Sequence, residues 1–452
     1  MYFYLHKSAA FPSNRSDSLQ RLLIDDLAEW KRQPGRKPVL LDGARQVGKT
    51  YLIEQLFGPQ EFRQVHRLDF RLEPGLAELF ADSLDPQAVI SNIELRFNVD
   101  IDVEQDLIFF DEVGECQAAV DSLKYFAEDL PQAFVCASGS NIGLLDSFPV
   151  GKVQQLELFP LCFEEFLMAA EQPRLLQAFR AQRRGQVVHQ QLWSFLLAYY
   201  FVGGMPEAVA EWFAGEGSIR ERVERVGRIH RDLIVGYQRD FGKYAGKLHA
   251  QHIDEVFASI PRQLASCQDD SVQRFRFRDV IERKRRYQEL RGPIDWLETA
   301  KLVRKCYPIK GKPQAPLWAQ ARQNIFKLYL FDVGLLGYML GLRYADQRAQ
   351  SLSFKGYIAE NFVQNELSVR VAYPTFGWEQ ANAQVEFLHR GRDGEVIPVE
   401  VKSGSRTRAR SLRSYVERYQ PRRAIKLIGG PGGGEGLIET WPLYYAQHLR
   451  DL

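Results

Sequence analysis

Strand-like runs alternate with segments of helical periodicity through the first third of the chain. The runs lie at 38–41, 64–70, 106–110 and 133–137, and apolar residues recur at helical spacing over 51–57. Buried strands that alternate with helices are typical of a parallel sheet covered by helices. The pattern therefore predicts an α/β domain built on a parallel sheet.

Helical periodicity dominates the middle of the chain. A lead-in helix at 19–30 is stopped by Pro34-Gly35 before the first strand. Residues from about 215 to 345 are mostly helical, and strand-like segments at 305–309 and 327–332 close this region. Helices followed by a small hairpin suggest a winged helix, which would read DNA or act as a lid or oligomer contact.

Composition is that of a globular protein with more than one core. The chain has 452 residues, of which 45% are hydrophobic and 26% charged, and this length favours two or three domains. It has no run of eighteen apolar residues, and its first residues do not resemble a signal peptide. The five cysteines form no C-x-x-C pair. We therefore expect no disulfide framework or zinc site, no membrane partner and a cytoplasmic location.

Charge is unevenly placed although the net charge is only +2. Acidic residues gather over 100–115, and basic residues gather within 274–286 and 402–426, where Glu417 is the only acid between Lys402 and Lys426. This asymmetry is compatible with nucleic-acid binding. A solvated helix face is the competing explanation.

Residues 43–50 read G-A-R-Q-V-G-K-T and match the phosphate-binding pattern G-x-x-x-x-G-K-[ST]. The backbone N–H groups of such a turn converge on an anion, and the dipole of the following helix adds partial positive charge. Lys49 should reach the β- and γ-phosphates of ATP, and the Thr50 hydroxyl should bind Mg²⁺. A structural role is the alternative for Arg45. The residues expected to bind nucleotide here are Gly43, Ala44, Arg45, Gln46, Val47, Gly48, Lys49, Thr50 and Tyr51.

Two acids end the strand predicted at 106–110. Asp111 at the end of a parallel strand is suited to hold Mg²⁺ through water, and Glu112 is suited to polarise the attacking water. The next strand ends in Ser138-Gly139-Ser140-Asn141. We assign Ser140 and Asn141 to sensing the γ-phosphate, with a helix cap as an alternative that does not exclude this role.

These motifs, with L-F-P-L-C-F-E-E-F at 158–166 and G-G-M-P-E at 203–207, occur in a specific order. The chain resembles a widespread prokaryotic AAA-type ATPase family that joins an AAA-like domain to a C-terminal domain of unknown function. Gly204-Met205-Pro206 is similar to the G-x-P motif of STAND-type ATPases, which implies that Pro206 contacts the nucleotide. A helix-start proline is the alternative. Lys152 stands where the family often has arginine, so a bidentate arginine role is in doubt there.

A second constellation lies in the last hundred residues. Glu360 falls on an amphipathic helix predicted over 354–369, Glu386 on a strand, and Glu400 and Lys402 two apart on the next strand, so that both point to one face. This order resembles the PD-(D/E)XK nuclease core. The resemblance implies that Glu360, Glu386 and Glu400 hold a divalent ion while Lys402 orients water or stabilises the transition state. The pattern usually has Asp where this chain has Glu386, which puts the metal geometry in doubt.

Pattern and resemblance together predict an α/β multidomain fold. The predicted units are residues 1–36 as a lead-in helix, 37–170 as a P-loop AAA-like domain, 171–245 as a helical lid with the G-x-P element, 246–345 as a winged-helix-like domain, and 346–452 as a nuclease-like domain.

Two functional hypotheses follow. The first is an ATP-driven switch or motor that acts on DNA or RNA through the nuclease-like domain, with Lys49, Glu112, Asn141 and Lys402 as its catalytic residues. The second is a STAND-like signalling or assembly ATPase whose C-terminal domain is inactive and binds a partner. A metabolic kinase would need neither the G-x-P element nor the C-terminal module. ATP and Mg²⁺ are the expected ligands, and a homo-oligomer is a candidate assembly.

Overall fold

The computed structural model describes residues 19–140, 142–144, 147–215, 217–266, 274–348, 355–369, 374–381, 383–404, 409–433 and 436–452. The predicted sensor residue Asn141 lies outside the described residues, as do Cys267, Arg406 and Arg408.

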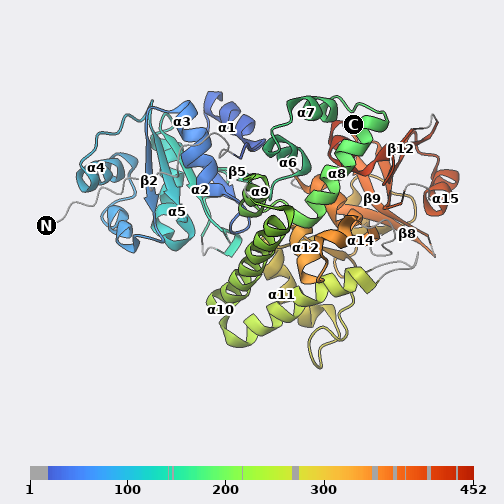
Figure 1. The fold of residues 1–452 in the computed structure, drawn as a ribbon. Coiled ribbons are helices and arrows are strands. Elements are labelled where there is room, and N and C mark those ends of the chain that lie inside the picture. Colours follow the sequence, from blue (N-terminus) through green and yellow to red (C-terminus); the bar gives the residue numbers. More distant parts are fainter. Residues whose placement is uncertain are drawn as a thin grey trace.

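Five parallel strands form the first sheet, in blue to cyan at the left of Figure 1. Their order is β2-β3-β4-β1-β5, and all the pairings are parallel, as the sequence predicts. The strand β4 lies between β1 and β3. Its carboxyl end is therefore flanked by the end of β1, which leads into the P-loop, and by the end of β3, which carries Asp111. The strands are β1 (Val39–Asp42), β2 (Val65–Asp69), β3 (Leu107–Asp111), β4 (Phe134–Ser138) and β5 (Gln154–Glu157).

Helices cover both faces of this sheet because successive strand residues point to opposite sides. Val39 and Leu41 pack in one core with α1 (Leu23–Arg32), the predicted lead-in helix. Leu40 packs in a second core with α4 (Pro86–Phe97) and α5 (Gln117–Asp129). The phosphate-loop edge of the sheet is therefore held from both sides.

A group of helices connects the first sheet to the second (Figure 1). The helix predicted around 229–244 is part of α10, which runs for 48 residues. The helix α9 begins at Pro206, immediately after the G-G-M segment. The helices are α6 (Phe163–Ala169), α7 (Pro173–Arg180), α8 (Gln186–Val202), α9 (Pro206–Phe213), α10 (Ile219–Ser266) and α11 (Tyr287–Thr299).

Seven strands form the second sheet, in the order β12-β11-β10-β9-β8-β6-β7. The pairs β6–β7, β8–β9 and β9–β10 are antiparallel, and β6–β8, β10–β11 and β11–β12 are parallel. The strands are β6 (Val303–Lys310), β7 (Lys327–Leu330), β8 (Thr375–Gln380), β9 (Ala383–Arg390), β10 (Val396–Lys402), β11 (Ala424–Ile428) and β12 (Ile438–Pro442). The helices α12 (Val333–Met339), α13 (Tyr344–Arg348), α14 (Lys355–Ser368) and α15 (Arg410–Tyr419) complete this part of the chain.

The predicted hairpin of a winged helix has a different place in the structure. The strands β6 and β7 do pair antiparallel, but β6 also pairs parallel with β8 from the C-terminal segment, with Cys306 opposite Thr375. The hairpin is therefore the end of the C-terminal sheet, and that sheet crosses the boundary predicted at residues 345/346. One continuous core runs from α1 through the connecting helices into this sheet.

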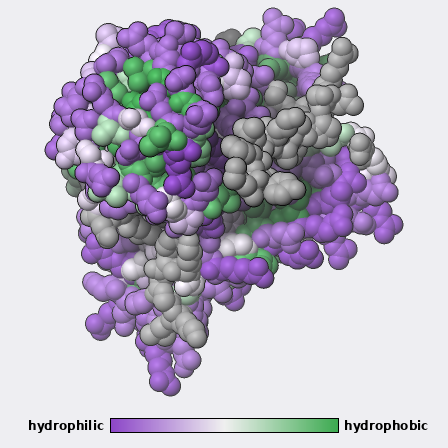
Figure 2. Space-filling model, turned by 90° about the vertical axis from the view of Figure 1, so that its left-hand side faces the viewer, coloured by the Kyte–Doolittle hydropathy of each residue, from purple (hydrophilic) through white to green (hydrophobic). Residues whose placement is uncertain are grey.

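The outer surface on the side of the first sheet is mainly hydrophilic, with interspersed hydrophobic side chains (Figure 2). Exposed large apolar residues of this domain include Leu72, Leu95 and Val150. Among the described residues, no helix is both long and apolar enough to span a membrane.

Candidate functional site

The phosphate loop joins the end of β1 to α2 (Lys49–Tyr51), which continues as a π-helical turn at Leu52–Phe57. Gly43 and Gly48 have φ angles of 154° and 91°, which favour glycine. A Cβ at Gly43 would lie 2.3 Å from the Leu158 carbonyl oxygen. These two glycines therefore allow both the turn and its close contact with the segment after β5.

Lys49 is buried at the base of this loop. Its Nζ donates to the carbonyl oxygens of Gly43 and Ala44, each at 2.9 Å. Burial lowers the pKa of Lys49 to about 8, against the opposing effect of nearby carboxylates such as Glu112. Among the described residues, the ammonium has no carboxylate partner within ion-pair distance. A buried cation held only by neutral carbonyls is well suited to a phosphate group.

Thr50 and Asp111 come together as a magnesium site requires. The Thr50 hydroxyl lies 2.9 Å from Asp111 Oδ2, and the Ser138 hydroxyl at the end of β4 lies 2.5 Å from Asp111 Oδ1. The Glu112 N–H also donates to Asp111 Oδ1 at 3.1 Å. Hydroxyl and carboxylate oxygens are the ligands that Mg²⁺ prefers. The residues present therefore fit a Mg²⁺ ion, with Thr50 and Asp111 as its holders.

Glu112 lies in the left-handed backbone region, with φ of 51°. This conformation is uncommon for a residue with a side chain, and backbone strain of this kind is found at many functional sites. Burial raises the pKa of Glu112, while the nearby Lys49 acts in the opposite direction. These properties suit a carboxylate that accepts a hydrogen bond from water.

Sequence reasoning missed Arg67, which contacts the same carboxylate. Arg67 Nε lies 3.0 Å from Asp111 Oδ2, and its Nη2 lies 2.6 Å from Asp69 Oδ2. Its Nη1 lies 3.3 Å from Glu54 Oε2. The sequence carried a hint of this contact, because residues two apart on a strand share a face and Arg67 and Asp69 are two apart on β2. In the sheet, Asp69 pairs with Asp111.

Arg45 connects the loop to two other segments. Its Nε donates to the Ser140 hydroxyl at 3.2 Å, and its Nη1 lies 2.5 Å from Asp240 Oδ2 on α10. The Tyr237 hydroxyl donates to the Arg45 carbonyl at 2.9 Å. The predicted sensor residue Ser140 therefore lies beside the loop.

Pro206 also lies next to the phosphate loop. A Cβ at Gly48 would stand 3.5 Å from Pro206 Cγ and 3.7 Å from Arg21 Nη1. Arg21, a residue that sequence reasoning missed, is buried and donates to the carbonyl oxygens of Val47 at 2.8 Å and Phe159 at 2.6 Å. Its Nε pairs with Glu165 at 3.1 Å. The G-x-P element and the N-terminal segment thus meet at the end of the loop.

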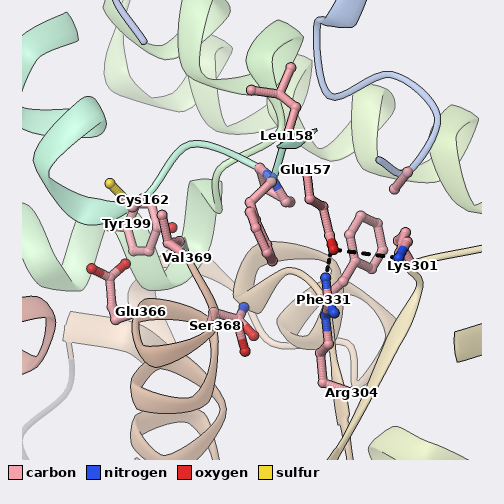
Figure 3. Close-up of a pocket in the computed structure, with 14 residues that line it drawn as sticks. Glu157, Leu158, Cys162, Tyr199, Lys301, Arg304, Phe331, Glu366, Ser368 and Val369 are labelled. Atoms are coloured by element: carbon pink, nitrogen blue, oxygen red, sulfur yellow. Dashed lines mark hydrogen bonds and ion pairs between the residues drawn. The ribbon is translucent and has the colours of Figure 1, made fainter. Parts of the chain in front are cut away.

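A pocket lies where the loop region meets the second sheet, and Figure 3 shows charged residues that line it. Lys301 Nζ lies 3.2 Å from Asp42 Oδ2 and 3.4 Å from Glu157 Oε2, and Arg304 on β6 also pairs with Glu157. Burial lowers the pKa of Arg304 to about 10. Because Asp42 directly precedes the loop and accepts the Gly43 N–H at 2.7 Å, this network links the base of the loop to β6.

The predicted C-terminal residues also gather in one place. Lys402 Nζ lies 3.6 Å from Glu386 Oε1 and 3.4 Å from Glu400 Oε1. The Val401 N–H donates to Glu386 Oε2 at 2.9 Å. Glu360 on α14 is close enough for its charge to raise the pKa of Glu386, although burial is the larger cause. Four residues from three elements therefore form one carboxylate cluster, defined as Glu360, Glu386, Glu400 and Lys402.

Two further groups that sequence reasoning missed contact this cluster. Lys327 Nζ lies 3.1 Å from Glu360 Oε2, and the Tyr329 hydroxyl lies 3.2 Å from the same oxygen. Lys327 and Tyr329 are two apart on β7, so the sequence alone could have placed both side chains on one face of the strand. Glu360 therefore has partners in the protein.

A divalent ion fits only part of this cluster. Glu400 Oε2 is buried and has no hydrogen-bond partner among the described residues, as a metal-ligating oxygen would. Burial first, then Glu386, raises the pKa of Glu400 to about 7. In the described part of the chain, no three His, Cys, Asp or Glu residues are grouped closely enough to hold a metal. The metal site with three carboxylates thus stays a prediction. The pair Glu386 and Glu400 offers part of such a site.

Comparison with known families agrees with the geometry of the phosphate loop. Residues 35–167 match the model of an AAA domain. This part of the chain is an AAA-type ATPase domain. Residues 195–346 and 355–431 match two domains of unknown function, DUF8612 and DUF4143. No curated protein matches the chain.

Solved structures show a limited overall similarity. A RuvB variant from Thermotoga maritima is 18% identical over 43% of this chain and 57% of its own, with a TM-score of 0.26. The Aeropyrum pernix ORC1 protein, solved in complex with DNA, is 14% identical over 71% of this chain and 90% of its own, with a TM-score of 0.26. PCH-2 from C. elegans is 12% identical over 43% of this chain and 62% of its own, with a TM-score of 0.28.

Proposed function

We propose that this protein is an ATP-hydrolysing switch of STAND-like type, in which the nucleotide state of the AAA domain controls the C-terminal α/β module. The arrangement of Lys49, Thr50 and Asp111 at the phosphate loop carries the proposal. Lys49 binds the phosphates and Glu112 orients the attacking water. Mg²⁺, held by Thr50 and Asp111, supplies positive charge that stabilises the transferring phosphoryl group.

Contacts from distant segments support a switch rather than an isolated ATPase. The loop and the residue before it are held by Lys301 at Asp42, by Asp240 at Arg45 and by Arg21 at Val47. A ligand that moves the loop must act on all three contacts. Its binding energy is thereby available to shift elements far from the nucleotide.

Two variants test the nucleotide step. Lys49→Ala should abolish ATP turnover because the phosphates lose their buried cation. Glu112→Gln should bind ATP yet hydrolyse it at least about a hundredfold more slowly, at the low end of the range for general-base loss. Phosphate release and fluorescent-nucleotide binding measure the two steps separately. Normal turnover in Lys49→Ala would refute the ATPase proposal, and normal turnover in Glu112→Gln would remove Glu112 from the water-orienting role.

Nucleic acid is the proposed partner of the C-terminal module. Lys426 on β11 is close enough to Glu400, Arg413 and Lys402 for their charges to act on its pKa, so basic side chains border the carboxylate cluster. The orphaned oxygen of Glu400 favours metal-dependent cleavage. The ion pair between Glu360 and Lys327 favours the alternative, a binding module without cleavage.

Cleavage of DNA and RNA with Mg²⁺ or Mn²⁺, with and without ATP, separates these two roles. If the module is a nuclease, the intact chain should cleave and Lys402→Ala should not. If ATP turnover is present and neither chain cleaves any substrate, the nuclease role is refuted and the role as a binding module is retained. Cleavage retained in Lys402→Ala would exclude the proposed role of this lysine.

A further inference from the structure

The edge strand β7 is fastened to the helix that carries Glu360. Lys327 and Tyr329 both contact the Glu360 carboxylate, at 3.1 and 3.2 Å. Leu330 exchanges two hydrogen bonds with the Asn361 side chain, since its N–H donates to Oδ1 at 2.9 Å and its carbonyl accepts from Nδ2 at 2.8 Å. All five residues are buried. Any shift of β7 must therefore carry the middle of α14 with it or break buried polar contacts.

The same strand ends two residues before a contact with the nucleotide side. Asp332 is fully buried and accepts the N–H of Gly204 at 2.6 Å and of Leu335 at 2.8 Å. A Cβ at Gly203 would lie 2.3 Å from Asp332 Oδ1, so the two segments are in close contact. Pro206 follows Gly204 by two residues and lies against the phosphate loop.

Leaving a buried carboxylate without its donors costs more than a typical net hydrogen bond. The segment from Gly203 to Pro206 and the segment from Lys327 to Asp332 are therefore expected to move as one unit. Packed elements of this kind respond to a small displacement by a discrete shift rather than a gradual one.

We propose that β7 and Asp332 transmit nucleotide occupancy from Pro206 to Glu360 in the carboxylate cluster. This inference rests on the proposed function, because it names the route by which the ATPase domain regulates the C-terminal module. Lys327 and Asp332 are positioning residues at the two ends of that route. Since coupling is reciprocal, a change at the Glu360 end also alters nucleotide affinity.

Amide hydrogen exchange of the wild-type chain tests the route directly. Exchange is compared without nucleotide, with ADP and with a non-hydrolysable ATP analogue, at nucleotide concentrations shown to saturate by fluorescence. Nucleotide should change the exchange of residues 327–332 and 355–369. Saturated binding with unchanged exchange in both segments would overturn the coupling alone. Absence of any nucleotide binding would overturn the proposed function and the coupling with it.

A matched pair of buried lysines supplies the second measurement. Lys327→Met should weaken binding of fluorescent ADP in EDTA by about fivefold or more, the low end of typical coupling between sites. Lys305→Met is the control, because Lys305 is equally buried on the neighbouring strand β6 but pairs with Asp295 and Glu298 on α11. The affinity of Lys305→Met for fluorescent ADP should stay within about twofold of the wild-type value. Equal weakening in both variants would overturn the coupling in favour of a general loss of stability.

Asp332→Asn examines the other end of the route by exchange. Asparagine has nearly the same size as aspartate, but it is neutral and has only one acceptor oxygen. It therefore cannot accept both N–H groups as the two carboxylate oxygens of Asp332 do. Nucleotide should still alter the exchange of the phosphate loop in this variant, and its effect on residues 355–369 should be reduced. An undiminished effect on that helix would exclude Asp332 from the route.

Discussion

Arg67 places its guanidinium among three carboxylates, those of Asp111, Asp69 and Glu54. Without this cation the three acids would repel one another. Arg67→Met should therefore lower the free energy of unfolding by about 2 kcal/mol, between the values for exposed and buried ion pairs, since the side chain is partly exposed. Mg²⁺ should restore part of the loss by neutralising Asp111. Thermal unfolding with and without Mg²⁺ measures both effects.

Arg63→Met is the matched control for this prediction. Arg63 pairs with Asp106 at 2.6 Å, two residues before β2 and away from the phosphate loop. Mg²⁺ should raise the Tm of Arg67→Met more than that of Arg63→Met or wild type. An equal rise in all three chains would show that the cation does not act at Asp111.

The residues predicted from the sequence and those missed differ in how local their signals are. Lys49, Thr50, Asp111 and Glu112 lie in short motifs whose neighbours fix the local structure, so the pattern alone is enough to predict them. Arg21 acts through contacts with Val47 and Phe159, and those contacts exist only after distant segments pack. Glu360, Glu386, Glu400 and Lys402 lie in one region of the structure, but their role as a metal and catalytic site stays a prediction.

The helices α6 and α14 meet at a buried carboxylate. Glu366 on α14 accepts the N–H of Phe163, the first residue of α6, at 2.9 Å. Burial raises the pKa of Glu366 to about 7, with nearby Arg450 opposing. The folded chain therefore holds this proton up to higher pH than the unfolded chain does, and the stability contributed by the protonated form is lost as pH rises from about 4.5 to about 7.

Glu366→Gln removes this titration. Over that pH window, the free energy of unfolding of wild type should fall more steeply than that of the variant, by at most about 1.4 kcal/mol per pH unit for one proton. Chemical denaturation at several pH values between 4 and 8 measures the two slopes. Parallel slopes would mean that Glu366 does not retain its proton in the folded chain.

At the scale of elements, the first sheet was predictable and the second only in part. Strands of the first sheet alternate with helices along the chain, which is the pattern of a parallel sheet, although β1 pairs with β4 rather than with β2. In the second sheet, β6 pairs with β8 across the segment that contains α12, α13 and α14. Local periodicity indicates that β6 and β7 are strands, but it does not specify a partner so distant in sequence. The hairpin was for that reason predicted as a winged helix.

At the scale of the whole molecule, the two sheets share one core and meet beside the phosphate loop. Asp42 at the end of β1 and Glu157 at the end of β5 both pair with Lys301, which precedes β6. The proposed nucleotide site therefore lies at the junction of the two sheets rather than within an independent domain. In the proposed switch, this placement would let a bound nucleotide influence the C-terminal module without a mobile linker.

The basic residues of that module should bind a phosphate backbone. Arg413 and Arg418 are exposed on α15, which packs against β9 and β10 beside the carboxylate cluster. Replacing both by glutamate should weaken binding of a labelled DNA or RNA oligonucleotide by about tenfold or more. For duplex DNA, the slope of log affinity against log salt concentration should become shallower by about 0.9 for each phosphate contact that is lost. Fluorescence anisotropy at several salt concentrations measures affinity and slope together.

A control with the same change in net charge separates a local site from general attraction. Arg228→Glu with Arg239→Glu alters two exposed arginines on α10 and should leave the salt slope close to that of wild type. If both double variants lose affinity equally, the nucleic acid responds only to total charge, and α15 is not its binding surface. Loss confined to Arg413→Glu with Arg418→Glu would place the phosphate backbone on α15, which packs against the strands that carry Glu386, Glu400 and Lys402.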